Sequence, residues 1–383
     1  MQRDEIIEVQ PVSRGAITVH TASLPDSNHQ AWRVEAEPAG GVLVFEGDAG
    51  HVGGPEWTNG RYLILPVLQN TDHSLWLNLR FWDSADEREG EVSGAHASIA
   101  IGVFPGFLVQ VVIPLSALRL DTLFLPRKPG TMKTVCTGTP VNPARVWRFS
   151  VTIPASAQPQ TVLFGHPRIS SNEPEYGIPA SHVVDELGQW NNKEWAGKTK
   201  GIEAVTANLR QWHAEMPMPL AGPFSRFGGW TARQFEASGF FRTKHDGDRW
   251  WLVDPDGHPF FSVGLDCIEP HCNGPVENLE TLFAWLPPRT GEFADAWSTA
   301  GSRGDFVSFS VVNLIRAFGN RWHDAWYELT EARLRHWGFN TIANWSEPHL
   351  GRRFSMPYVT GMGSFPTTQH RIFRDLPDVF SSE

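Results

Sequence analysis

The sequence contains little of what marks several protein classes. It has 3 cysteines among 383 residues, which excludes a disulfide-stapled scaffold, because such scaffolds carry many cysteines in a short chain. No run of about 18 apolar residues occurs, and the N-terminus has no basic segment followed by an apolar one, so neither a membrane-spanning helix nor a signal peptide is predicted. As written, the chain is expected to be cytoplasmic, without a membrane partner.

The spacing of the cysteines does not match that of a metal site either. Cys136, Cys267 and Cys272 cannot all pair within one chain, and we expect them to be free thiols. His271 lies between the last two, but three ligands within six residues match no zinc-site spacing. No metal and no cofactor is predicted.

Basic clusters are absent too. The formal net charge is -10 and the Lys and Arg residues are dispersed, which excludes nucleic acid as a partner, because phosphate binding needs a basic face. What the chain does have is aromatic residues, 17 Trp and 24 Phe beside 4 Tyr. Such side chains fill cores or stack on flat apolar faces of ligands, including sugar rings.

Residues 1–170 carry short alternating runs separated by Gly, Pro and Asn. In residues 74–83, Leu75, Leu77, Leu79 and Phe81 fall on one face of a strand. Turn signals at this spacing without long helices predict a β-sandwich. Further strands are expected at 61–70, 107–115 and 146–154.

Residues 171–238 read as a connector with one helix at 202–215, which the prolines that follow end. A hairpin comes next, because Asp254-Pro255-Asp256-Gly257 lies between two apolar runs and favours a tight turn. The arm after the turn is so uniformly apolar that we expect a buried strand with Phe260, Phe261, Val263, Leu265 and Ile268.

Residues 239–383 then alternate helices and strands. Short helices are predicted at 279–285 and 293–297, and longer ones at 311–318 and 321–337, with Gly338 at the left-handed position that ends the last. Strands are expected at 339–345 and 357–363. This order fits the opening of a (β/α)8 TIM barrel.

Several of these segments resemble agarase-type glycoside hydrolases of family 50. The hairpin with FFRT at 240–243 and SVGLDC at 262–267 is similar to the family's barrel entry. VDELGQW at 184–190 with KEWAGK at 193–198 resembles its connector, and RLRHWGFNTIANWS at 333–346 its second barrel strand. The resemblance implies a carbohydrate-binding-module-like sandwich before a catalytic barrel, and a polysaccharide partner. Related agarases are commonly exported.

A complete barrel needs about 250 residues, and residues 259–383 supply about half of that, so we expect the sequence to be truncated inside the barrel. A partial parallel sheet has unpaired edges, so poor stability or association is expected. The resemblance places the two catalytic glutamates at the ends of the fourth and seventh strands, and therefore no catalytic residue is assigned here. The alternative is that Glu269 and Glu347, which each follow a predicted strand, form their own acid/base pair.

Six residues after the first two barrel strands are the candidate substrate-binding residues. Parallel strands end at one rim, where barrel enzymes build their active sites. We expect Trp345 to stack on sugar and the polar members to bind hydroxyl groups; for Trp345 and Asp266, packing and a buried hydrogen bond are the alternative. The candidates are Asp266, Glu269, His271, Asn344, Trp345 and Glu347.

Three hypotheses follow for the function. The first is a fragment of a β-agarase-like glycoside hydrolase that cleaves β-galactosidic bonds of agarose or a related galactan with retention, the fragment itself being inactive. The second is a non-catalytic carbohydrate-binding protein in which the sandwich binds the sugar. The third is that both parts are structural remnants without a ligand.

Overall fold

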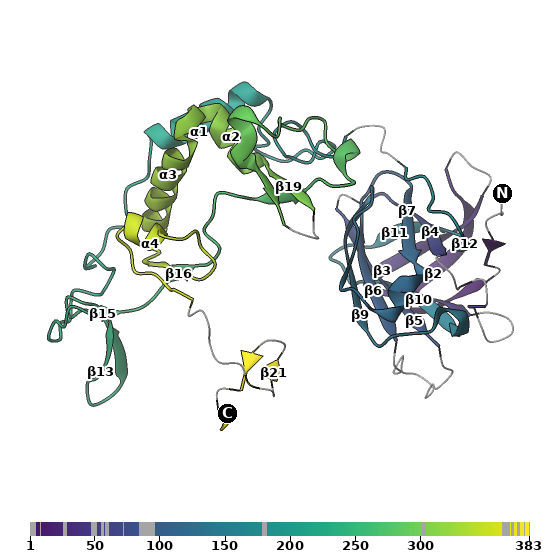
Figure 1. The fold of residues 1–383 in the computed structure, drawn as a ribbon, viewed down its shortest axis with the longest axis horizontal. Helices are drawn as coiled ribbons and strands as arrows, with labels where there is room; N and C mark the ends of the chain where they lie inside the picture. Colours follow the sequence, from purple (N-terminus) through teal and green to yellow (C-terminus); the bar gives the residue numbers. More distant parts are fainter. Residues whose placement is uncertain are drawn as a thin grey trace. The chain divides into compact units, whose positions relative to one another are not determined.

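The structure is a computed structural model, and Figure 1 shows the course of the chain. It describes residues 5–7, 9–25, 29–46, 52–54, 57, 61–71, 73–83, 96–177, 182–300 and 304–361, with short pieces between 368 and 382. The chain forms two compact units, the first from residues 1–198, 274–288 and 297–307, and the second from residues 199–273, 289–296 and 308–383.

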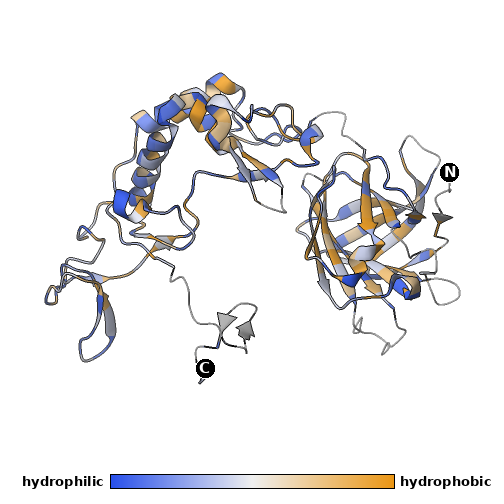
Figure 2. Ribbon diagram, viewed as in Figure 1, coloured by the Kyte–Doolittle hydropathy of each residue, from blue (hydrophilic) through white to orange (hydrophobic). Residues whose placement is uncertain are grey.

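The first unit consists mainly of antiparallel β-strands. Figure 2 shows that hydrophobic residues make up many segments of these strands. Twelve strands form one sheet, in the order β1-β12-β4-β11-β3-β10-β5-β6-β9-β8, with β2 added to β3 and β7 to β4. The strands are β1 (Glu5–Ile6), β2 (Gln10–Ser23), β3 (Gln30–Glu46), β4 (Tyr62–Gln69), β5 (Leu75–Trp82), β6 (Ala97–Val103), β7 (Val109–Pro114), β8 (Phe124–Leu125), β9 (Thr131–Gly138), β10 (Arg148–Ile153), β11 (Gln160–Gly165) and β12 (Arg168–Ser170).

A large buried cluster holds the strands of this unit together. Side chains of β4 and β12, near one end of the strand order, share a single buried cluster with side chains of β5, β6 and β9, near the other. The sheet must therefore curl around the cluster. The predicted β-rich unit is confirmed, but the two layers expected of a sandwich belong to one continuous sheet.

The long strand β3 explains this continuity. Its residues 31–36 pair with β11, whereas residues 41–46 pair with β10. Between the halves, Gly40 has a φ of +71°, and a Cβ there would lie 2.4 Å from the carbonyl oxygen of Ile153. Only glycine fits this bend, which lets one strand serve both parts of the sheet.

The predicted alternation in β5 is confirmed. Leu75, Leu77, Leu79 and Phe81 are at most 2% exposed, whereas Trp76 on the other face is 45% exposed. The cysteines are free thiols, with Cys136 buried and the other two exposed.

Among the described residues, the second unit contains four α-helices and the parallel strands. Its elements are α1 (Ile202–Ala214), α2 (Phe309–Phe318), α3 (Trp322–His336), α4 (Leu350–Arg353), η5 (Gly291–Ala296), η7 (Gly319–Arg321), β13 (Arg242–His245), β14 (Trp250–Val253), β15 (Pro259–Phe260), β16 (Gly264–Leu265), β20 (Thr341–Ile342), β21 (Arg371–Phe373) and β22 (Leu376–Pro377).

A small three-stranded sheet was not predicted. Its strands are short and lack a clear alternation of polar and apolar residues, and most of their residues belong to the first unit. The strands are β17 (Asn273–Pro275), β18 (Trp297–Thr299) and β19 (Asp305–Ser308), and the remaining 3-10 helices are η2 (Leu115–Arg119), η3 (Pro143–Arg145) and η4 (Glu280–Leu282).

The predicted hairpin is confirmed as the antiparallel pair β14 and β15. The buried Asp254 closes its turn, because one carboxylate oxygen accepts the amide N–H groups of Asp256 at 3.0 Å and His258 at 2.8 Å. Gly257 has a φ of +96°, as the turn requires. The helix at 322–336 also ends as predicted, before Gly338 with a φ of +79°.

Three chain segments of the second unit run parallel. β16 pairs in parallel with β20, and Ile342 of β20 forms a parallel bridge with Tyr358. These are the three strands predicted at the opening of a barrel, although residues 362 and 363 of the third lie outside the described residues. The closed (β/α)8 barrel stays a prediction.

The prediction of one buried strand from Phe260 to Ile268 is wrong. Both ends are buried, but Phe261, Val263 and Leu265 are 82%, 38% and 39% exposed. The reason is that the side chains which could bury this segment pack elsewhere: the buried cluster of this region forms around Ile342 of β20, with side chains from α3 and α4. In the part of the chain that the structure describes, no layer covers the apolar face of β16.

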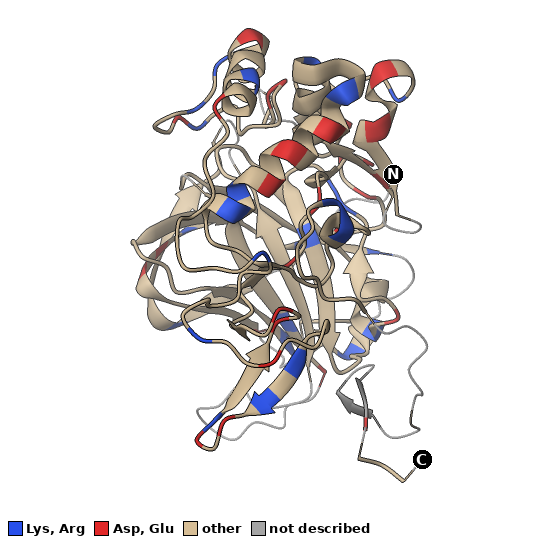
Figure 3. Ribbon diagram, turned by 90° about the vertical axis from the view of Figure 1, so that its left-hand side faces the viewer, with Lys and Arg blue, Asp and Glu red and all other residues tan. Residues whose placement is uncertain are grey.

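Charge is mixed over the chain. In Figure 3, the Lys and Arg segments are separated by uncharged stretches and lie among Asp and Glu segments. Among the described helices, none has both the length and the apolar character needed to cross a bilayer.

Candidate functional site

The loops that follow β16 and β20 lie together and define the candidate site. The amide of Cys267 donates to the carbonyl oxygen of Asn344 at 2.9 Å, and the amide of Glu347 donates to the carbonyl oxygen of Ile268 at 2.9 Å. The hydroxyl of Ser346 also accepts the amide of Ile268 at 3.2 Å. These bonds join the loops at residues 266–272 and 344–347 into one rim, as expected for adjacent parallel strands.

Two rim residues have an unusual backbone conformation. Cys267 and Trp345 both have a φ of +57°, in the left-handed region that non-glycine residues seldom adopt. Such a conformation costs about 1–3 kcal/mol and is typical of functional sites. At Trp345 the turn leaves the side chain 74% exposed, so an indole ring stands free beside the joined loops.

Glu347 is fixed by α3. Its carboxylate accepts the hydroxyl of Tyr327, and the Nε2 atom of His323 lies 3.2 Å from the same oxygen and 3.3 Å from the other. Tyr327 and His323 are one helical turn apart and their rings stack, with centroids 4.5 Å apart. The three side chains, which we call the Glu347 latch, tie the second loop to the helix that precedes its strand.

The latch has an electrostatic signature. Burial, followed by the hydrogen bond to Glu347, raises the pKa of Tyr327 to about 12. The guanidinium of Arg353 lies 4.1 Å from the centroid of the Tyr327 ring and forms an ion pair of 2.6 Å with Asp324. The phenol therefore keeps its proton at physiological pH and donates it to the Glu347 carboxylate.

His271 is held on the other side of the rim. Its Nε2 atom lies 3.1 Å from the carbonyl oxygen of Asp295, whose carboxylate accepts the indole N–H of Trp322 at 3.1 Å. The imidazole and the Trp322 ring meet edge to face at 6.3 Å. One ring nitrogen is thus occupied, and the other is the one that a ligand could use.

Five of the six predicted residues divide between two cavities of the second unit. Asn344, Trp345 and Glu347 line a cavity of about 440 Å³ that the segment 342–361 forms almost alone. Glu269 and His271 line another of about 550 Å³, bounded by α1, α2 and α3. Asp266 is exposed and lines neither. The structure thus joins the loops through their backbones, while the side chains serve two separate openings.

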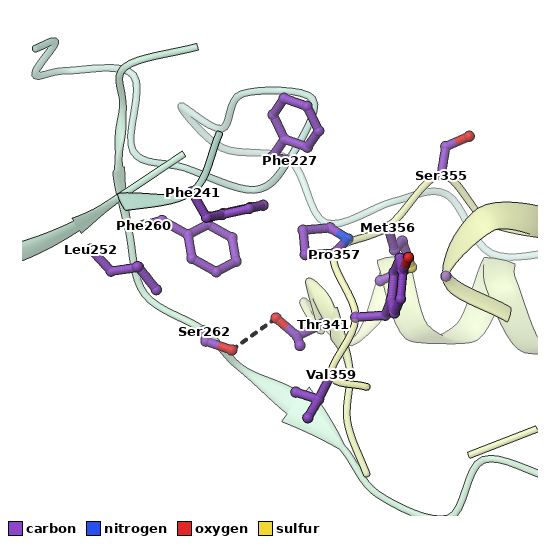
Figure 4. A pocket seen from close by; sticks show the side chains of 12 residues that line it. Phe227, Phe241, Leu252, Phe260, Ser262, Thr341, Ser355, Met356, Pro357 and Val359 are labelled. Atoms are coloured by element: carbon purple, nitrogen blue, oxygen red, sulfur yellow. Dashed lines mark hydrogen bonds between the residues drawn. The ribbon is translucent and has the colours of Figure 1, made fainter. Parts of the chain in front are cut away.

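A third cavity, of about 510 Å³, lies where the parallel strands begin and is shown in Figure 4. The rings of Phe227, Phe241 and Phe260 line it, and the only polar contact drawn joins the hydroxyls of Ser262 and Thr341, 2.9 Å apart. It contains no carboxylate, amine or imidazole. Such a lining can pack against apolar groups but offers no acid or base.

Sequence reasoning missed His323 and Tyr327. Their spacing of four residues on a helix directly before a barrel-like strand was an available signal, because such residues share one helix face. Nothing in the sequence indicated that this face meets the loop after the strand. Within the described residues, no group of three His, Cys, Asp or Glu side chains could hold a metal ion.

Comparison with known proteins places the chain near the β-agarases. It is 28% identical over 208 residues to β-agarase B of Vibrio sp. (strain JT0107), and 28% identical over 226 residues to β-agarase A of the same strain. The matches cover 46% and 52% of this chain and 22% of each relative, so the chain spans about a fifth of the relatives' length. The predicted resemblance to agarase-type glycoside hydrolases is confirmed.

Among solved structures, one described as "Structural analysis of an exo-beta-agarase" is similar over 97% of this chain and 59% of that chain, with 20% identity and a TM-score of 0.48. No family model matches the sequence.

Proposed function

We propose that this chain is part of a glycoside hydrolase that cleaves β-galactosidic bonds of agarose or a related galactan with retention. In this proposal the second unit supplies the first strands of a (β/α)8 barrel, and the rim at residues 266–272 and 344–347 binds the polysaccharide. The premise is the similarity to β-agarases over about half of the chain.

The exposed Trp345 carries the proposal. Sugar rings present flat C–H faces that stack on indole, and the ring of Trp345 stands at the end of a parallel strand in a backbone conformation that costs free energy. Asn344 and Glu347, which line the same cavity, offer an amide and a carboxylate for sugar hydroxyls. A stacking platform flanked by hydrogen-bonding groups fits a neutral saccharide.

Glu269 and Glu347 are assigned to binding and not to bond cleavage. A retaining mechanism needs two carboxyl groups about 5 Å apart, one as nucleophile and one as acid and base. The two glutamates line different cavities, and the Glu347 carboxylate is already held by Tyr327 and His323. As the resemblance implies, the catalytic glutamates belong to later strands, so this chain should bind sugar without cleaving it.

The test uses an agarose hexasaccharide and hydrogen-exchange mass spectrometry on the full chain. We expect the sugar to slow exchange in peptides covering residues 343–350, and to release no new reducing ends on incubation. In Trp345→Ala, the apparent affinity for the sugar, measured from the concentration that gives half of this protection, should fall about tenfold. The reason is that a stacked ring contributes about 0.5–1.5 kcal/mol beyond its buried area.

Trp250→Ala is the matched control, because Trp250 is 70% exposed in the same unit but lies on the hairpin. It should bind like the unsubstituted chain. Equal loss in both variants, or no protection of residues 343–350 at saturating sugar, would rule out the rim as the binding site.

A further inference from the structure

The outer face of the first unit's sheet presents an aromatic ring among polar side chains. Figure 1 shows β10, β5, β6 and β9 in the first unit, where they are consecutive in the strand order. Leu75, Leu77 and Leu79 of β5 point into the core, so the side chains between them lie on the outer face. Trp76 is among these, and 45% of its surface is exposed.

Strand register arranges this face in rows. In one row Trp76 is opposite Gly102 of β6, and in the next Asn78 is opposite Thr152 of β10 and Ala100 of β6. In the third, Arg80 is opposite Ser150 and Ser98, and Ser98 is opposite Thr137 of β9. These rows contain no carboxylate and a single cation.

The first row is apolar because Gly102 has no side chain. Met132 occupies the space above it, with its Cβ, Cγ and sulfur atoms at 3.0, 3.3 and 3.3 Å from where a glycine Cβ would lie. Met132 is 41% exposed. An indole and a thioether thus flank one glycine and form an exposed apolar pair, which we call the Trp76 platform.

The neighbouring rows supply hydrogen-bonding groups. The hydroxyl of Ser98 donates to the side-chain carbonyl oxygen of Asn78 at 2.8 Å, and this bond does not use the NH2 group of Asn78. The Nε–H of Arg80 is buried and has no hydrogen-bond partner, a state that costs about 1–3 kcal/mol. The side chains of Arg80 and Asn78 are both half-buried, so a guanidinium and an amide remain partly accessible in the rows beside the Trp76 platform.

We propose that this face is a second polysaccharide-binding site, in which a neutral sugar ring stacks on the Trp76 platform and sugar hydroxyls bond to Asn78 and Arg80. Flat C–H faces with hydroxyls at their edges match an aromatic ring flanked by amide and guanidinium groups. The absence of carboxylates in the rows and the single cation favour an uncharged glycan. The identification of that glycan as agarose rests on the proposed function; the site itself does not.

The experiment measures depletion of the full chain from solution by washed agarose particles. Trp76→Ala should weaken binding at least fivefold, whereas Trp76→Tyr, which keeps a flat ring, should stay within twofold of the unsubstituted chain. Trp195→Ala is the matched control, because Trp195 is 43% exposed in the same unit and lies outside these strands. Equal binding by the Trp76→Ala and Trp195→Ala chains would overturn the proposal.

A second measurement needs no substitution. With the agarose hexasaccharide bound, we expect slower exchange in peptides covering residues 75–82 and 97–103. Protection confined to residues 343–350 would refute the second site and leave the proposed function intact. Protection confined to β5 and β6 would support the second site and count against sugar binding at the rim. Binding of the sulfated galactan carrageenan with no binding of agarose would contradict the assignment of a neutral ligand.

Discussion

Replacing Tyr327 by Phe removes one hydroxyl from the Glu347 latch and should loosen the second loop of the rim. A hydrogen bond to a charged group contributes about 1.5–3 kcal/mol, and partial solvent exposure lowers this to about 1–2 kcal/mol. His323 remains in contact with the carboxylate, so the loop should open more often without unfolding. A loss of about 1–2 kcal/mol corresponds to opening about 5–30 times more often.

Hydrogen exchange reads this opening directly. The amide of Glu347 donates to Ile268, and the amide of Cys267 to Asn344, so both should exchange about 5–30 times faster in Tyr327→Phe. Tyr176→Phe is the control, because the Tyr176 hydroxyl donates to Glu173 in the first unit. Rates within twofold of the unsubstituted chain at both amides would refute the latch.

Three further outcomes are expected. Because the folded state raises the pKa of Tyr327 to about 12, the contribution of this phenol to stability should be complete below about pH 10 and lost between pH 10 and 12. In a titration followed by absorbance near 295 nm, the Tyr327→Phe chain should lack one phenol that ionises late. A titration curve unchanged by the substitution would contradict this. Backbone amides, the indole of Trp251 and the charge of Arg233 lower the pKa of Asp246. The β13–β14 hairpin should therefore be stabilised above about pH 4 and lose this stabilisation as the pH falls through the lower folded value. In Asp246→Asn, the protection factors of the hairpin amides, which correct for the intrinsic pH dependence of exchange, should no longer fall with acid. Phe149 is fully buried and its ring stacks on Phe45 at 4.6 Å, so Phe149→Ala should reduce the free energy of unfolding of the first unit by about 3–5 kcal/mol in urea; a loss below about 1 kcal/mol would show that this core is not close-packed.

Local patterns account for the parts of the fold that could be predicted. The alternation of Leu75, Leu77 and Leu79 defines β5, and the Asp-Pro-Asp-Gly turn defines the hairpin, because both depend on neighbours in sequence. Burial around Phe261 could not be predicted in the same way. It depends on which element covers the strand, and in the described residues that cover lies around β20.

The same distinction between local pattern and tertiary packing applies to the candidate site. The rim followed from the rule that parallel strands end together, and Cys267 and Asn344 are joined as that rule requires. The split of Glu269 and Glu347 between two cavities depends on how α3 packs, and so does the latch on Glu347. A helix face has several orientations compatible with one sequence, and tertiary packing selects among them.

The double pairing of β3 has a consequence for synthesis on the ribosome. β2 and β3 are adjacent in sequence and can form a hairpin as soon as both have emerged, but Glu46 pairs with Arg148 and Ala31 with Gly165. Until translation has passed β11, the early hairpin keeps an open edge of unpaired backbone groups, which invites pairing with other nascent chains. Slower elongation before β10 would lengthen that exposure, and a chaperone that covers the edge of β3 would give most benefit in this interval.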